Sequence, residues 1–282
     1  MKSVEDIAYF SIIDGNRNFT KVAKAWIYSA RKSGVKNLFI YSLCPITADI
    51  IKNKFSDVHV RRVNLEALSD YDDAGRKRPF GHIPNAKVIS SLELLEEFSS
   101  VIYCDLDAVF LKNPTQVFKE LLESHDLLFS MALGTMRYPP GAAQKRGWVI
   151  CSGCFGMSNT RSTKIFLSTM SSWFINGGGP TLKELRQVFS LKSGHVKKDL
   201  QSLMNFYFFN KEEWLPHHPS RERRFQENPS FTFGDLRLRL LSQAIVNRAP
   251  TKISGTPYMR HILAPCARSK IQKFKRDFPD FS

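Results

Sequence analysis

One short stretch, residues 101–114 (VIYCDLDAVFLKNP), constrains the fold more than any other part of this sequence. Its first four residues form an apolar run, which is typical of a strand buried in a parallel sheet. Such a strand must be covered on both faces, so the run favours a central sheet between two layers of helices. Two aspartates, Asp105 and Asp107, follow the run at once.

The residues before this stretch alternate between strand and helix patterns. Short β-prone runs predict strands at residues 4–13, 37–43 and 57–63, and apolar residues at helical spacing predict helices at 18–34, 47–55 and 85–98. Thr47 is expected to cap the second of these helices. Since β-α-β connections are right-handed, we predict an α/β fold: a Rossmann-like, mostly parallel sheet with helices on both faces.

The second half of the chain continues with both kinds of element. We expect helices at 115–124, 160–174 and 197–209 and strands at 127–133, 148–157 and 236–241. Loops or hinges are predicted at 64–84, 138–146 and 176–180, where polar residues, Pro and Gly gather. The predicted organisation is a single domain over 1–265. A basic tail over 266–282 follows.

The two aspartates point to a cation site. In extended backbone, residues two apart point to the same side, so Asp105 and Asp107 would converge while Leu106 faces the core. They follow a strand, and ligands of open α/β sheets bind outside the carboxyl ends of strands. Hard carboxylate oxygens suit Mg²⁺ or Mn²⁺, and the open positions of such an ion suit a diphosphate. The pair therefore predicts an anchor for a nucleoside diphosphate.

The net charge and the cysteine content limit the expected partners and cellular location of the protein. The formal net charge of +15 attracts polyanions: nucleic acid, an anionic membrane surface, an acidic glycan or a diphosphate substrate. No apolar run approaches the roughly 18 residues of a membrane helix, and the first residues lack a signal-peptide pattern. Five cysteines, an odd number, favour a reduced cytoplasmic setting over a disulfide framework. The lone C-x-x-C of Cys151 and Cys154 is interpreted as coincidence.

The acidic stretch SSVIYCDLDAVFLKNP resembles the signature of the nucleotide-diphospho-sugar transferases with the type A glycosyltransferase fold. Within them, the sequence is most similar to the family that includes plant cell-wall xylosyl- and galactosyltransferases. The resemblance covers most of residues 5–265 and implies a nucleotide-binding half to about residue 115 and a sugar and acceptor half over about 116–265. Its other parts are Lys87 and the segments NFTKVAKAWIYSARKSGVKNLFIYSL, CSGCFGMSNTRSTKIF and KDLQSLMNFY.

The resemblance implies roles for particular residues. It implies Asp107 as a metal ligand, Asp105 as a contact to the ribose or the metal, and His261 as the residue that completes the metal site. Lys87 and Ser11 would contact the nucleotide part of the donor. The sugar pocket is assigned to Ser152 and Gly153, and the surroundings of the anomeric carbon to Gln201 or Asp199. The sequence departs from the family pattern at Cys44, Cys151 and Leu200, where the usual residues are Asp, Asn and Asp.

The implied reaction is metal-assisted glycosyl transfer with retention, in polysaccharide biosynthesis. The donor would be a nucleoside diphosphate sugar, for which the resemblance favours a UDP-sugar, and Mn²⁺ or Mg²⁺ would offset charge on the departing diphosphate. Retention could follow from same-face attack or from a covalent intermediate on a carboxylate. The acceptor would be a glycan or glycolipid, and the net charge favours an acidic one.

Two alternatives stay open at this point. The motif D-L-D-A-V also fits a haloacid-dehalogenase-like phosphatase, although that class places the motif on its first strand. The net charge and the Phe-bearing basic tail, residues 268–282, fit a polyanion-binding protein or peripheral attachment to an anionic membrane. No recognised nucleic-acid-binding motif accompanies the tail, so nucleic acid is not an expected partner.

Overall fold

The computed structural model describes residues 5–15, 17–63, 82–132, 149–175, 178–189, 199–209, 230–248, 253–262 and 266–281. The first half contains β1 (Glu5–Ile13), α1 (Arg17–Lys32), β2 (Leu38–Ser42), α2 (Pro45–Lys54), β3 (His59–Arg62), α3 (His82–Leu95) and β4 (Phe98–Cys104). The middle contains β5 (Ala108–Phe110), α4 (Thr115–Ser124), β6 (Leu127–Ala132), β7 (Val149–Ser158), α6 (Arg161–Ile175), α7 (Leu182–Phe189) and α8 (Leu200–Phe209). The last part contains β8 (Ser230–Phe233), β9 (Leu236–Leu241), β10 (Val246–Arg248), β11 (Met259–His261) and α10 (Ala267–Asp277).

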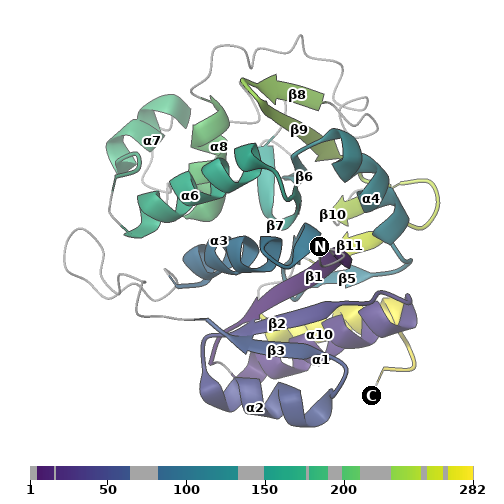
Figure 1. The fold of residues 1–282 in the computed structure, drawn as a ribbon. Helices are drawn as coiled ribbons and strands as arrows, with labels where there is room; N and C mark the ends of the chain where they lie inside the picture. The colour runs from purple at the N-terminus through teal and green to yellow at the C-terminus, as the bar shows by residue number, and fades with distance from the viewer. Residues whose placement is uncertain are drawn as a thin grey trace.

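The main sheet has eight strands in the order β3-β2-β1-β4-β7-β6-β9-β8 (Figure 1). The strands β1 to β4 pair in parallel, as the alternation of strand and helix predicts. Beyond β4 the pattern changes, because β7 runs antiparallel to both β4 and β6. The predicted fold class is confirmed: four of the pairings in this sheet are parallel and helices cover both faces.

Two apolar clusters fill the space on the two faces of this sheet. Helices α3, α6 and α8 pack on one face, and α1 and α4 pack on the other. Neighbouring residues of β1 alternate between the clusters: Tyr9 packs with α1 and α4, and Phe10 packs with α3. In β4, Ile102 and Cys104 lie on the α1 side and Tyr103 lies on the α3 side. The end of β4 is thus packed between two apolar layers.

Two local expectations differ from the structure. The helix predicted to reach residue 98 ends at Leu95, because β4 already begins at Phe98. The short second helix begins at Pro45 with Cys44 as its N-cap, so Thr47 does not cap it. The Thr47 hydroxyl instead bonds to Ser42 Oγ at 2.7 Å and to the Cys44 carbonyl. Proline is well suited to a first helical position because it lacks the N–H that would be unpaired there.

The predicted loops fall largely outside the described residues. Residues 64–81 and 133–148 and part of the hinge at 176–180 are not among them, nor are the first residues of the helix expected at 197–209. None of the helices in the described part of the chain combines the length and hydropathy that crossing a membrane requires.

The C-terminal segment is a packed helix. Helix α10 lies beside α1 (Figure 1), with Phe274 and Phe278 buried against Tyr28. Ion pairs of Arg260 with Asp277 and of Lys32 with Asp280 add to this contact. The basic tail therefore presents its aromatic residues to the protein, and its exposed positions are mostly charged.

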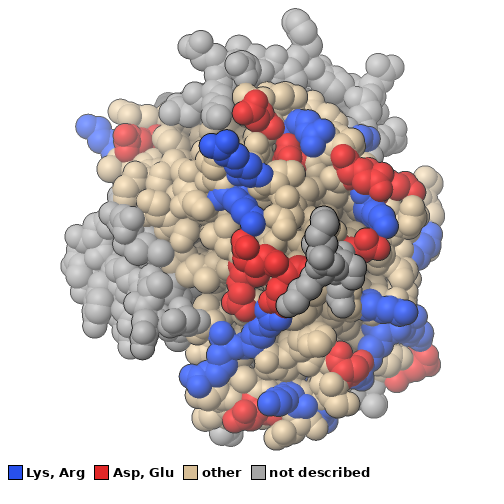
Figure 2. Space-filling model, viewed as in Figure 1, with Lys and Arg blue, Asp and Glu red and all other residues tan. Residues whose placement is uncertain are grey.

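Charges of both signs are interspersed over the face shown in Figure 2. Arg61 contacts Glu93 and Glu97, and Lys164 contacts Glu96 at 2.6 Å, so acidic side chains at the end of α3 lie between basic ones. The view shows no unbroken basic surface among the described residues on this face.

Candidate metal and nucleotide site

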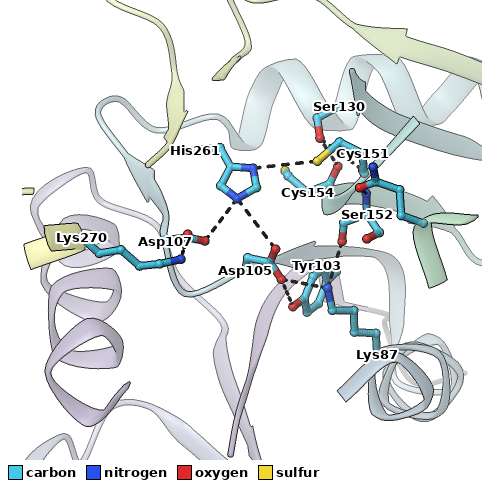
Figure 3. A network of polar contacts seen from close by, with 11 residues as sticks. Lys87, Tyr103, Asp105, Asp107, Ser130, Cys151, Ser152, Cys154, His261 and Lys270 are labelled. Atoms are coloured by element: carbon cyan, nitrogen blue, oxygen red, sulfur yellow. Dashed lines mark hydrogen bonds and ion pairs between the residues drawn. The ribbon is translucent and has the colours of Figure 1, made fainter. Parts of the chain in front are cut away.

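The acidic pair lies in a turn directly after β4. The Asp105 N–H donates to the Gly153 carbonyl at 2.7 Å, and the Ala108 N–H donates to the Asp105 carbonyl at 2.8 Å. This turn corrects the expectation that residues 105–107 are extended. Leu106 does pack into the apolar cluster on the α1 side. The two carboxylates still converge, because the turn folds both toward the same histidine (Figure 3).

A second, small sheet brings His261 to this turn. Strand β5, which follows Asp107, pairs antiparallel with β11, and Ala108 lies opposite His261. The Ile262 N–H donates to the Asp107 carbonyl at 2.7 Å, which fixes the register at the acidic turn itself. The imidazole Nε2 then lies 3.2 Å from Asp107 Oδ1 and 3.8 Å from Asp105 Oδ2.

These three residues fit a divalent cation. One ligand atom from each lies within 4.8 Å of the others, and no other group of three His, Cys, Asp or Glu residues in the described ranges does so. Ligands about 2.1 Å from an octahedral ion lie roughly 3 to 4.2 Å from one another, which is the range of the distances to His261. Two hard oxygens and an imidazole suit Mn²⁺ or Mg²⁺.

Basic side chains neutralise the carboxylates from either side. Lys87 donates to Asp105 Oδ1 at 2.9 Å and to the Ser152 carbonyl at 3.2 Å, while Lys270 of α10 pairs with Asp107. The Tyr103 hydroxyl also donates to Asp105. Burial raises the pKa of the Asp107 carboxyl, but His261 and Lys270 outweigh it and hold this pKa well below its usual range.

The pKa of His261 shows how strongly this pocket attracts positive charge. Burial lowers this pKa, yet the neighbouring Asp107 more than compensates and raises it to about 10. A buried carboxylate pair favours any cation placed between its oxygens, whether proton, ammonium or metal ion. The site is therefore built for positive charge, and its open side faces a pocket of about 500 Å³.

Gly153 of β7 makes room for the three candidate ligands. A Cβ atom at this position would lie 2.3 Å from His261 Cε1 and 2.8 Å from Asp105 Oδ2. No larger side chain fits without displacing one of them. The acidic turn, His261 of β11 and Gly153 of β7 therefore lie in direct contact.

Strand β7 also fixes the far wall of the pocket. The Ser152 N–H donates to Gln201 Oε1 at 3.3 Å. Asn205, one turn further along α8, bonds both the N–H and the carbonyl of Ile150 at 3.0 and 2.9 Å. These contacts hold α8 against β7 and direct Gln201 into the pocket. Asp199 accepts the Ser202 N–H at 2.9 Å and so acts as a cap of α8.

The structure brings most of the sequence-derived candidates together. Asp105, Asp107, Ser152, Gly153, Gln201 and His261 line the pocket, and Lys87 contacts two of them. Asp199 is not among the described residues that line it, and neither is Ser11, which is fully buried in β1. Sequence reasoning missed Arg248 and Lys270 as pocket residues. Neither lies in a motif, so only the fold could reveal them.

One family model matches the sequence of this chain, and several solved structures resemble its fold. A family model described as nucleotide-diphospho-sugar transferase matches residues 35–243. The galactosyltransferase LgtC, in complex with donor and acceptor sugar analogues, is similar over 98% of this chain and 96% of its own, with a TM-score of 0.57 and 13% identity. Mouse xyloside xylosyltransferase 1 is similar over 91% of this chain and 97% of its own, with a TM-score of 0.55 and 11% identity.

A third structure, the bifunctional glycosyltransferase WbbM, is similar over 97% of this chain and 50% of its own, with a TM-score of 0.55 and 10% identity. No curated protein sequence matches the chain. At these identities the structural likenesses show the fold, which is the type A glycosyltransferase fold.

Proposed function

This chain belongs to the nucleotide-diphospho-sugar transferase family and is a glycosyltransferase, and from that premise we propose a metal-dependent reaction with a UDP-sugar donor. The acceptor would be a glycan or glycolipid, as in polysaccharide biosynthesis. The observation that carries the proposal is the convergence of Asp105, Asp107 and His261 within 4.8 Å at the mouth of a pocket. A carboxylate pair with one histidine and open coordination positions suits an ion that also binds a diphosphate.

When bound, Mn²⁺ or Mg²⁺ supplies positive charge against the charge that develops on the departing diphosphate. The chain's own cations act in the same direction. Lys87 is held by Asp105 and the Ser152 carbonyl, so its ammonium group is already oriented at the pocket wall. Lys270 lies on the other side, at Asp107. Fixed charges of this kind need no reorganisation during the reaction.

Gln201 is the favoured group beneath the reacting sugar carbon. It lines the pocket and its side-chain oxygen is held by the Ser152 N–H, whereas Asp199 caps α8. One solved LgtC structure carries a glutamine-to-glutamate mutation in its active site, so a glutamine belongs to the active site of that protein. This arrangement supports retention by same-face attack, because the glutamine amide is a poor nucleophile but can stabilise positive charge.

The first test is calorimetric titration of UDP into the protein with Mn²⁺ and again with EDTA. We expect binding that requires the metal and that falls about 100-fold or more in Asp107→Ala, because that change removes a ligand and leaves the opposing cations unpaired. Asp49→Ala, which removes an exposed carboxylate of α2, is the matched control and should bind UDP as the wild type does. Failure of UDP and other nucleoside diphosphates to bind in either condition would refute the donor assignment.

Retention is tested separately on the product. Once a donor and acceptor pair is found, the anomeric configuration of the new glycosidic bond is compared with that of the donor by NMR. An inverted product would contradict the placement of Gln201 on the face opposite the leaving group.

Peripheral contact with an anionic membrane remains part of the proposal. Helix α10 exposes Lys273, Lys275 and Arg276 while its phenylalanines are buried, which supports electrostatic attraction rather than insertion of aromatic side chains. A cytoplasmic location is likewise proposed from the reduced state expected of the cysteines.

A further inference from the structure

The pocket contains a cation that the proposed reaction does not use. Arg248 is the last residue of β10, and in the pairing of β10 with β11 it lies beside His261. Its backbone N–H donates to Gln243 Oε1 at 2.8 Å, which holds the end of the strand in place. Its side chain lines the pocket together with Cys151, Ser152 and Gln201.

Two nitrogens of the Arg248 guanidinium group lack acceptors. Its Nε and Nη1 atoms are buried and have no hydrogen-bond partner, and no carboxylate pairs with it among the described residues. Buried donors in native proteins are nearly always satisfied, and a buried unpaired charge is costly. An arginine binds a carboxylate through two parallel hydrogen bonds at either of two edges, Nε with Nη2 or Nη1 with Nη2. Each of the two unpartnered nitrogens belongs to one of these edges, so the missing partner has the chemistry of an anion such as a carboxylate, whose two oxygens fit one edge.

The position of Arg248 separates this anion from the diphosphate. The acidic pair that would hold the metal is flanked by Lys87 at Asp105 and Lys270 at Asp107, and these cations suit the diphosphate. Arg248 lies on the other side of His261, toward Cys151 (Figure 3 shows His261 between Asp107 and Cys151). The Arg248 charge acts on Cys151: burial raises the pKa of the Cys151 thiol, and Arg248 is the strongest of the influences that lower it.

Cys151, Ser152 and Gln201 form the wall where the transferred sugar would lie if the proposed function holds. We propose that Arg248 binds a carboxylate on that sugar, so that the preferred donor is a UDP-uronate, whose sixth carbon is a carboxylate, rather than the corresponding neutral UDP-hexose. This inference rests on the proposed function, since it needs a UDP-sugar in the pocket. A neutral sugar offers Arg248 one uncharged hydroxyl oxygen in place of the two charged oxygens of a carboxylate, and would bind more weakly for that reason.

The test compares donors that differ only at the sixth carbon. UDP-glucuronate against UDP-glucose, and UDP-galacturonate against UDP-galactose, are titrated by calorimetry with Mn²⁺ into the wild type, Arg248→Gln and Arg248→Lys. We expect the wild type to bind one of the uronates about 10- to 100-fold more tightly than its neutral partner, the range for a hydrogen-bonded charge pair. Arg248→Gln should abolish the preference, and Arg248→Lys should keep part of it because lysine retains charge but not the fork.

Two control measurements isolate the effect of the Arg248 guanidinium group. UDP itself should bind Arg248→Gln with wild-type affinity, which also shows that the variant is folded. Arg268→Gln, which removes an exposed charge of α10 that does not line the pocket, should keep the preference and so controls for net charge.

Three outcomes would overturn the inference. Equal affinity for both members of both pairs in the wild type would refute it outright. Weaker binding of UDP in Arg248→Gln would make Arg248 a diphosphate contact instead. Arg248-dependent binding of free glucuronate or galacturonate to the protein already saturated with UDP and Mn²⁺, with no preference among donors, would place the carboxylate on the acceptor. If UDP does not bind at all, the proposed function has failed, and the two failures are thereby distinguished.

Discussion

Replacing Gly153 with alanine is the sharpest test of the candidate metal site, because the change adds only one methyl group. That methyl would lie 2.3 Å from His261 Cε1 and 2.8 Å from Asp105 Oδ2, whereas ordinary contact begins at 3.4 Å. The imidazole must therefore move by about 1 Å, several times the roughly 0.2 Å that metal–ligand distances tolerate. We expect Mn²⁺ affinity to fall about 100-fold, or about 2.8 kcal/mol at 1.4 kcal/mol per tenfold.

Stability should change little, since the displaced atoms are side-chain atoms at a pocket wall. We expect a melting temperature within about 4 °C of the wild type, which corresponds to a loss of about 1 kcal/mol. Mn²⁺ affinity is measured by calorimetry or by the water-proton relaxation of the bound ion, and unfolding by circular dichroism.

Substitutions at two other glycines distinguish an effect on Mn²⁺ binding from an effect on folding stability. Gly156→Ala places a methyl 2.8 Å from Ile102 Cδ1 in the core, so it should cost about 1–3 kcal/mol of stability and leave Mn²⁺ binding intact. Gly178→Ala meets no heavy atom within 4 Å and should change neither quantity. Wild-type Mn²⁺ affinity in Gly153→Ala would show that Asp105 and His261 do not hold the ion together, and the reasoning would be wrong.

Three further predictions concern charge. Lys270→Met should bind Mn²⁺ about tenfold more tightly in the absence of nucleotide, because the ion no longer competes with an ammonium group for Asp107. The affinity is measured by calorimetry, with Lys273→Met, at an exposed position, as the control. An unchanged Mn²⁺ affinity would contradict the prediction. Burial, together with the charges of Arg239 and Arg237, lowers the pKa of His125. The unfolded chain therefore binds more protons than the folded one, and stability should fall as the pH drops below about 6.5. Melting curves of His125→Gln should lose that part of the pH dependence. Combining Lys273→Glu with Lys275→Glu should weaken sedimentation with anionic liposomes and spare UDP binding, and equal sedimentation would exclude α10 as the contact.

The parts of this fold that sequence reasoning predicted depend on local patterns. Strand β4 is recognisable because its apolar run is continuous, and α1 because Phe19, Val22 and Trp26 recur at helical spacing. The acidic pair was found for the same reason, since two carboxylates after a buried strand are visible in one short window. Their turn was not predicted, because it depends on the bond from the Asp105 N–H to Gly153 on a strand far along the chain.

The parts that could not be predicted depend on pairing between distant short segments. Strands β5, β10 and β11 have three residues each, too few to show a period, yet their register sets His261 against Asp107 and Arg248 against His261. Resemblance to a family could supply His261 as a candidate. It could not supply Arg248 or Lys270, whose positions follow from how β10 and α10 pack.

The C-terminal segment carries more of the site than its composition suggests. His261 comes from β11, and Lys270 comes from the helix that follows it, so one stretch of chain supplies two of the groups that contact Asp107. The helix is held by burial of Phe274 and Phe278 and by the Arg260–Asp277 pair, and none of these residues lines the pocket. Packing of a surface helix against α1 thus sets the position of a charge at the candidate metal site. The basic residues of α10 are then of two kinds: Arg268, Lys273, Lys275 and Arg276 are exposed, whereas Lys270 pairs with Asp107 and lines the pocket.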